Sequence, residues 1–175
     1  MFKAEDALLY YWASLVRSYN RLVMVECGDW YEKDFGSELD LYYSFFVKCY
    51  HLKDWLMKLA EKDKKKNIRE RVEKSTELRA CRNVCNSTKH FLLDHKEVDA
   101  NAQLANLSGL GEGISLFREY SPLGHLRGDR QCYEIRIETV GKRWTAIELA
   151  TACMEQWAEL IQGNWDVTLP NFRRS

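Results

Sequence analysis

The stretch from Leu78 to Leu92 carries two helical patterns at once. Apolar and small residues recur at steps of three and four, namely Leu78, Cys81, Cys85, Thr88 and Leu92. This spacing is typical of one face of an α-helix, so it predicts a helix from about Ser75 to Leu93 that packs against other elements. Polar residues with the same spacing occupy a neighbouring face, namely Arg79, Asn83, Asn86 and His90.

The polar face of this helix has an unusual composition. A generic solvated face is filled with Glu and Lys, whereas Asn is a poor helix former that is usually found at caps and turns. Asn83, Asn86 and His90 in mid-helix therefore indicate that something polar is bound there. The alternative is that these side chains hydrogen-bond a neighbouring loop and only hold the fold together.

Length and composition predict a single packed domain. The chain has 175 residues, of which 46% are hydrophobic and only 2 are Pro, which favours long helices. Lys and Arg number 26, as do Asp and Glu, so the formal net charge is zero. No overall attraction to nucleic acid or to a membrane follows from this balance, and any polyanion must be bound by a local patch.

Two long helices are predicted before the helix around Cys81. The first runs from Glu5 to Glu26 and ends before a Gly, and its inner side carries Leu8, Tyr11, Leu15, Leu22 and Val23. The second begins after Ser37, a good N-cap, and continues to about Lys62. Its apolar positions are Phe45, Cys49, Leu52, Leu56 and Leu59.

The second half of the chain predicts strands and a final helix. Residues 114–120 are expected to form a strand, and the alternation of residues 133–138 predicts a half-buried strand. Thr145 and Glu148 form a capping-box pattern at the start of a helix that ends near Gly163, with Leu149, Cys153, Trp157 and Leu160 facing inward. The predicted fold is therefore a mainly α helical bundle with a small β-hairpin before the C-terminal helix. It forms a single domain over residues 1–165 with a tail over residues 166–175.

Charged residues are concentrated between Lys58 and Lys74. Such a run is usually a solvated turn and helix end, and a short helix is expected over residues 68–74. A contact with a polyanion is the alternative interpretation.

The six Cys residues lie mostly at apolar positions, and we find no signal peptide or membrane-spanning run. A reducing cytoplasm with free thiols is therefore expected, together with the absence of cofactors. Cys81 and Cys85, with His90 or His95, offer a weak zinc pattern that lacks a CxxC pair, so no metal site is predicted.

Two segments carry a resemblance to a known family. The first is FVKCYHLKDWL over residues 46–56, and the second is CRNVCNSTKHF over residues 81–91. Together they resemble small bacterial proteins with an HEPN-like helical bundle. The resemblance implies a helical fold that is often a homodimer. It also implies either a metal-independent ribonuclease of a toxin or antiphage system, or an inactive module that binds nucleotides, RNA or a partner protein.

The catalytic signature of that family is an Arg followed by four to six residues and a His. Here seven residues separate Arg82 from His90, with Asn86 midway. The eight helical steps place the two Cα atoms about 12 Å apart. As the resemblance implies, His90 would exchange a proton with an RNA 2′-hydroxyl or leaving oxygen, Arg82 or Arg79 would pair with the phosphate, and Asn86 would orient the reacting groups. Asn83 and Lys89 are expected to add binding contacts.

A second polar pair occurs in the first motif. His51 and Asp54 lie three residues apart and share a helix face, either as an acid–base dyad or as an ordinary surface contact. Lys53, Asp54 and Trp55 are expected to anchor the helix around Cys81, with Trp55 in the core. Three function classes stay open: a ribonuclease, a non-catalytic RNA- or nucleotide-binding module, and a structural or scaffold protein that dimerises or binds a partner protein.

Overall fold

The computed structural model describes residues 4–26, 35–94, 115–120, 133–139 and 142–172. Side chains are described over residues 5–26, 40–86, 135–137 and 142–172. In chain order the elements are α1 (Ala4–Glu26), α2 (Phe35–Leu59), α3 (Lys62–Lys74), α4 (Thr76–Asp94), β1 (Ser115–Tyr120), β2 (Tyr133–Thr139), β3 (Lys142–Thr145) and α5 (Ala146–Asn164). The mainly helical fold predicted from the sequence is confirmed.

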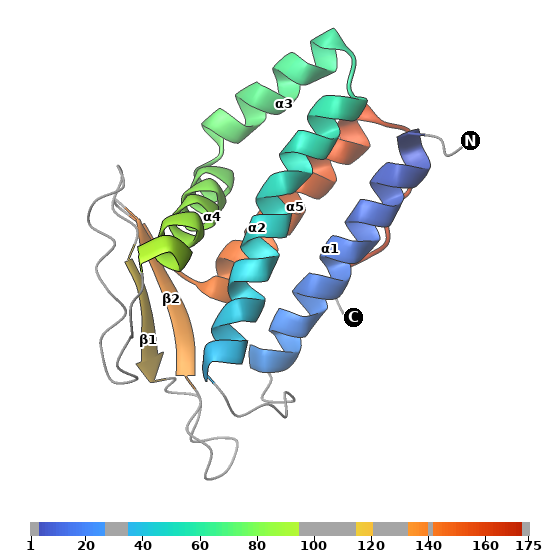
Figure 1. Ribbon diagram of the computed structural model, residues 1–175. Coiled ribbons are helices and arrows are strands. Elements are labelled where there is room, and N and C mark those ends of the chain that lie inside the picture. Colours follow the sequence, from blue (N-terminus) through green and yellow to red (C-terminus); the bar gives the residue numbers. More distant parts are fainter. Residues whose placement is uncertain (1–3, 27–34, 95–114, 121–132, 140–141, 173–175) are drawn as a thin grey trace.

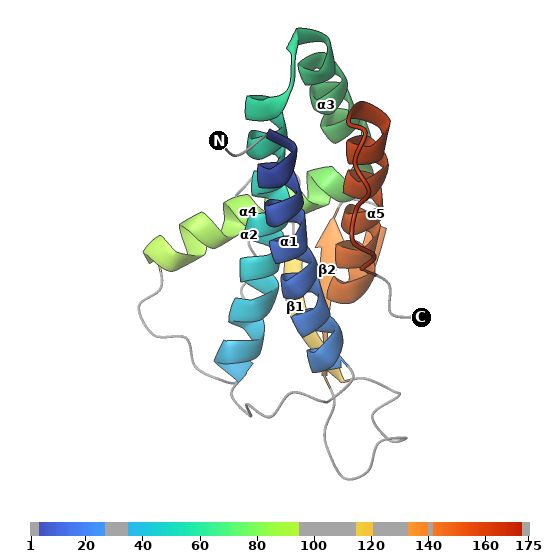
Figure 2. The ribbon, with the colours of Figure 1, turned by 90° about the vertical axis from the view of Figure 1, so that its right-hand side faces the viewer.

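Helix α2 is the centre of the bundle, because it contacts α1, α3, α4 and α5. Figure 1 shows α1 on one side of α2, α3 and α4 on the other, and α5 behind it. Figure 2, turned by 90°, shows α3 beside one end of α5 and the strands beside the other. The helices that hold the candidate residues, α2 and α4, pack directly on each other.

The buried positions follow the predicted stripes. Phe45, Cys49, Leu52 and Leu56 of α2 are fully buried, and Leu59 is partly buried. The burial of Leu52 confirms the register expected for this helix. Along α4, Leu78, Cys81 and Cys85 are fully buried, whereas the side chains of Thr88 and Leu92 lie outside the described part.

The charged segment after α2 is more helical than expected. We predicted that α2 would reach Lys62 and that a short helix would follow over residues 68–74, but α2 ends at Leu59 and α3 begins at Lys62. The reason is the pair Ile68 and Val72, which lie one turn apart and are both fully buried. Their burial holds a whole charged helix on the bundle, because tertiary packing supplies most helix stability.

Ser75 separates α3 from α4. Its backbone N–H donates to the Arg71 carbonyl at the end of α3, and its Oγ accepts from the Leu78 N–H at 3.1 Å. The chain therefore turns at a residue that caps both helices. At the other end of the fold, the predicted capping box is present, because the Thr145 hydroxyl accepts from the Glu148 N–H and the Glu148 carboxylate accepts from the Thr145 N–H.

The predicted strands are confirmed and belong to one antiparallel sheet with the order β1-β2-β3. Strand β3 was not foreseen as a separate element, because its four residues run directly into the cap of α5. Ile137 faces Trp144 across the β2–β3 pair, and both are buried together with Ile135. This apolar side joins the sheet to the helical core.

The residues after α5 pack on the bundle, although no pattern predicted it. Figure 2 shows residues 165–172 running back along α5. Trp12 donates from its indole N–H to the Pro170 carbonyl at 3.1 Å, and the Phe172 ring packs edge-on against Trp12 and Tyr19. Within the described residues, we find no helix with the length and apolar character needed to cross a membrane.

Candidate functional site

The polar face of α4 consists, in its described part, of Arg79, Arg82, Asn83 and Asn86. Asn86 is exposed and the other three are half-buried, while the opposite side of the same helix is fully buried. Two distinct faces were predicted from the spacing, and the structure places them as expected up to Asn86. All four side chains therefore reach the surface, Asn86 as an exposed residue and the other three in part.

Both arginines of this face are restrained. Arg82 forms an ion pair with Glu73 of α3 at 3.4 Å, and its side chain is 29% exposed. Arg79 has a buried Nε atom with no hydrogen-bond partner among the described residues. A buried donor without an acceptor is costly, so Arg79 retains hydrogen-bonding capacity that the described part of the chain does not use.

His90 and Lys89 lie on the same helix, but their side chains are outside the described residues. The backbone of α4 is helical from Thr76 to Asp94 without a break. Arg82 and His90 are therefore separated by eight helical steps, or about 12 Å along the axis. One phosphate cannot contact both residues at their helix positions unless the long Arg82 side chain extends along α4.

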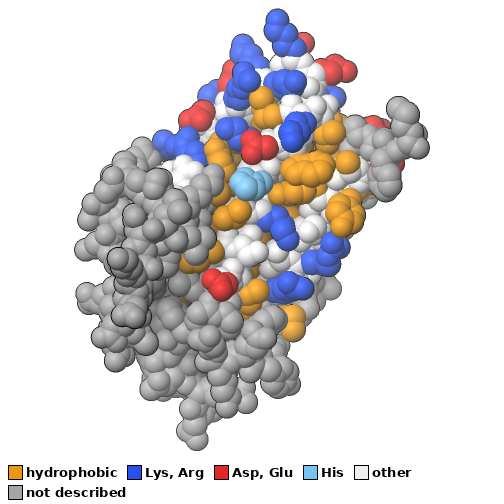
Figure 3. Space-filling view, viewed as in Figure 1, with side chains coloured by type: hydrophobic (Ala, Val, Ile, Leu, Met, Phe, Trp, Pro, Cys, Tyr) orange, Lys and Arg blue, Asp and Glu red, His pale blue; other side chains and the backbone are white. Residues whose placement is uncertain are grey.

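Helix α3 adds a basic surface next to this face. It contains seven basic residues and three acidic ones. Figure 3 shows Lys and Arg side chains gathered over α3. Glu70 pairs with Lys66 and Lys74, whereas Lys62 and Arg69 are exposed without an ion-pair partner in the described part. The charge run is therefore solvated, as expected, and is joined to the polar face of α4 through Arg82 and Glu73.

His51 and Asp54 do not form a dyad in this structure. His51 is half-buried, Asp54 is exposed, and no hydrogen bond or ion pair joins them. No such contact links either of them to the polar face of α4 within the described side chains. The expected acid–base dyad is therefore not formed, and neither a hydrogen bond nor an ion pair provides the alternative surface contact between the two residues.

The expectation that Trp55 belongs to the core is wrong. Its side chain is 40% exposed, because Leu52 and Leu56 occupy the inward positions of α2 and leave Trp55 on the side toward α1. There its ring packs against Tyr11 with centroids 5.2 Å apart. Lys53 lies over the Tyr50 ring of its own helix at 5.6 Å. These contacts do not support the predicted anchor between this motif and α4.

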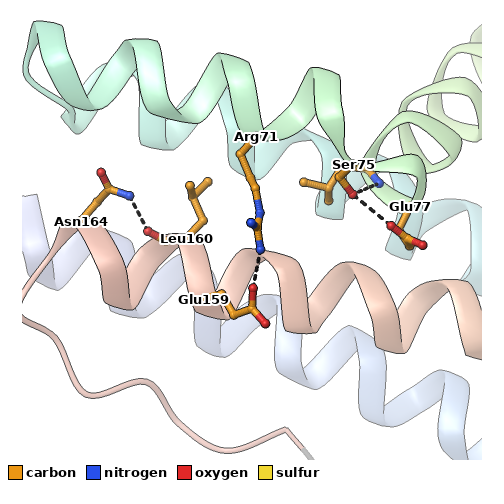
Figure 4. A network of polar contacts seen from close by, with 7 residues as sticks. Arg71, Ser75, Glu77, Glu159, Leu160 and Asn164 are labelled. Carbon is orange, nitrogen blue, oxygen red and sulfur yellow. Dashed lines mark hydrogen bonds and ion pairs between the residues drawn. The ribbon is translucent and has the colours of Figure 1, made fainter.

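Two surface grooves lie along α5, away from the predicted residues. The larger, of about 420 Å³, lies between α1, α5 and residues 169–172. The smaller, of about 270 Å³, lies between α3 and α5. Figure 4 shows Arg71 reaching from α3 to an ion pair with Glu159 and Asn164 donating to the Leu160 carbonyl. The ion pair joins α3 to α5 across the smaller groove, whereas the Asn164 bond lies within α5.

One cluster was missed by sequence reasoning. The thiols of Cys49, Cys81 and Cys153 converge from α2, α4 and α5, with their Sγ atoms all within 4.8 Å of one another. We call this group the thiol triad. Cys85, which we had considered together with Cys81 as a zinc pattern, lies outside it. Each triad residue was predicted as buried, but no spacing rule brings together residues so far apart in the chain.

The thiols of the triad act on one another. Burial raises the pKa of Cys81 and Cys153, and their contacts with Cys49 also raise it. Burial would raise the pKa of Cys49 as well, but the neighbouring Cys153 and Cys81 thiols and the nearby Trp157 indole lower it. Cys49 is therefore the thiol of the triad whose pKa is lowered. All four described cysteines are free thiols, as predicted, and Cys27 and Cys132 lie outside the described residues.

Comparison of this chain with protein families, with curated proteins and with solved structures finds no match.

Proposed function

We propose that this protein is an HEPN-like RNA- or nucleotide-binding protein, with the polar face of α4 as its binding surface. The observation that carries the proposal is that the exposed Asn86, the half-buried Asn83 and two half-buried arginines share one helix face beside the basic surface of α3. Since the net charge of the chain is zero, this local surface supplies the attraction that the whole molecule lacks.

The chemistry of the surface suits single-stranded RNA. Lys and Arg of α3 would neutralise backbone phosphates and release counterions. The amides of Asn83 and Asn86 can both donate and accept, so they suit base edges and 2′-hydroxyls of unpaired nucleotides. The half-buried Arg79 adds a positive charge at the same face.

Cleavage is the further step within this proposal. His90 would accept the proton of a 2′-hydroxyl, which then attacks the adjacent phosphorus, and a proton donor would protonate the leaving 5′-oxygen. Arg82 would stabilise the developing phosphorane charge after release from Glu73, and Asn86 would orient the groups. The nucleophile belongs to the substrate, so this reaction needs no metal.

A non-catalytic binding module is the second candidate, and two observations favour it. The continuous helix holds Arg82 and His90 about 12 Å apart along the axis, and Arg82 is engaged by Glu73. Both features weaken a joint action on one phosphate but leave binding intact. A homodimer or a partner protein would then use the same surface as a scaffold.

Binding is tested by fluorescence anisotropy of a labelled unstructured RNA over a range of salt concentrations. The Arg79→Ala variant should weaken binding and lower the salt slope by about 1. The double variant Asn83→Ala/Asn86→Ala should weaken binding without changing the slope. Arg17→Ala, on the exposed side of α1, is the matched control and should bind like the wild type. Equal binding by all these proteins would refute the proposed surface.

Cleavage is tested with the same RNA in EDTA. His90→Ala should abolish cleavage while RNA binding persists, and Arg82→Ala should lower the rate by about 10²–10³. If the wild type binds RNA but leaves it intact, the non-catalytic module is correct. A fall in melting temperature of His90→Ala, without any RNA binding by the wild type, would make the polar face structural.

A further inference from the structure

The thiol triad has the form of an ion-binding site. Its members come from α2, α4 and α5, so three separate helices deliver one sulfur atom each to the same point in the core. All three side chains are fully buried. Single buried cysteines usually serve as small hydrophobic residues, but that role does not require three thiols to converge.

A second observation points to the same place. The indole N–H of Trp157 is fully buried and has no hydrogen-bond partner among the described residues, although it lies near the Cys49 thiol. Buried indole N–H groups usually find an acceptor. A thiolate sulfur bound to an ion would supply that acceptor. The resulting hydrogen bond would be strong, because the acceptor carries negative charge.

The spacing of the sulfur atoms fits a three-coordinate ion. An ion at about 2.3 Å from three sulfur atoms holds them about 4.0 Å apart when it lies in their plane, and closer together when, like arsenic(III) with its lone pair, it lies above that plane. The triad sulfurs already lie within 4.8 Å of one another, so small side-chain rotations close the site. Two of the thiols now donate to backbone carbonyls, Cys81 to Phe46 and Cys153 to Glu77, and those bonds would be given up.

The surroundings select the charge of the ion. Within the described residues, no fourth Cys, His, Asp or Glu joins the triad, which disfavours the four-coordinate geometry of structural zinc. The charged neighbour that acts on the triad is the acid Glu77. Glu77 is itself paired with Lys142, and no basic group of the described residues acts on the three thiols, so a complex with net negative charge would be costly in this core. Three thiolates are balanced only by a trivalent ion.

We propose that Cys49, Cys81 and Cys153 bind one trivalent thiophilic ion as a neutral tris-thiolate complex, with arsenic(III) as the representative. Arsenous acid, As(OH)₃, exchanges its three hydroxyl groups for three sulfur ligands. Three As–O bonds and three S–H bonds break, three As–S bonds form, and three water molecules leave. Neither arsenic nor sulfur changes oxidation state. This site is independent of the RNA-binding surface proposed above.

The test is titration of the full-length folded protein with arsenite, in a phosphine reductant that carries no thiol. Native mass spectrometry and the ultraviolet absorption of arsenic–thiolate bonds are the readouts. One arsenic should bind per chain, and the mass of the protein should rise by that of one arsenic atom less the three thiol hydrogens that leave in water. Cys85→Ala, a buried cysteine of α4 outside the triad, is the matched control and should bind arsenic normally.

Loss of an outer-shell partner lowers the affinity of a metal site by roughly 10–100-fold. Loss of a sulfur ligand should lower the affinity for arsenic by more than this in each of the variants Cys49→Ala, Cys81→Ala and Cys153→Ala. If a variant fails to fold, its place is taken by an alkylation experiment on the wild type, which identifies the cysteines that arsenite protects. Protection of the three triad cysteines supports the proposal. Absence of bound arsenic, protection of Cys85 instead, or zinc binding in preference to arsenite overturns it.

Discussion

Truncation of Leu52 to alanine tests the packing of α2 at the centre of the bundle. The side chain of Leu52 is completely buried, with 0% of its surface exposed to solvent. Burying a leucine side chain contributes about 1.5–3 kcal/mol, and the cavity left by its removal raises the total cost to about 2–5 kcal/mol. For a chain of this size, each kcal/mol lowers the melting temperature by about 2–4 °C, so Leu52→Ala should lower it by roughly 4–20 °C.

The assay is thermal and urea denaturation followed by circular dichroism. Lys58→Ala, on the exposed side of the same helix, is the control and should change the free energy of unfolding by less than about 0.5 kcal/mol. An unchanged slope against urea would show that only stability has changed. If Leu52→Ala unfolds at the same temperature as Lys58→Ala, the position of α2 between its neighbours is incorrect.

Two further predictions concern pH. Burial opposes ionisation of Glu77, but hydrogen bonds from Lys142 and Ser75 outweigh it and lower the pKa of this carboxyl below the usual 4.5. The ionised carboxylate therefore stabilises the fold fully above pH 4.5, and this contribution is lost as the pH falls through the lowered pKa of the folded state. Glu77→Gln should therefore flatten the acid limb of stability against pH, and an unchanged limb would argue against the Glu77–Lys142 ion pair. Burial, with smaller effects of Cys49 and Asp54, raises the pKa of Tyr11 to about 12, so its contribution is complete below pH 10 and is lost toward pH 12. Tyr11→Phe should remove one phenol that titrates near pH 12 from the absorbance titration. Loss of a phenol that titrates near pH 10 instead would contradict the burial of the Tyr11 hydroxyl.

Short-range patterns determined much of this fold from the sequence alone. Helical spacing identified the buried sides of α2 and α4, because a side chain's face follows directly from its position in the helical repeat. The capping box of Thr145 and Glu148 was readable for the same reason, since all of its atoms lie within one turn. The polar face of α4 was equally local, and Asn83 and Asn86 occupy the surface that their spacing predicted.

Tertiary packing decided what spacing could not. Trp55 had a core-like identity, but Leu52 and Leu56 took the inward positions and left it against Tyr11. Helix α3 had a solvated composition, but two buried residues were enough to hold it on the bundle. The thiol triad required three helices to cross at one point, and the sequence carries no periodic signal for residues more than thirty positions apart. Local rules give the face of a helix, whereas only the packed arrangement of helices determines which faces meet.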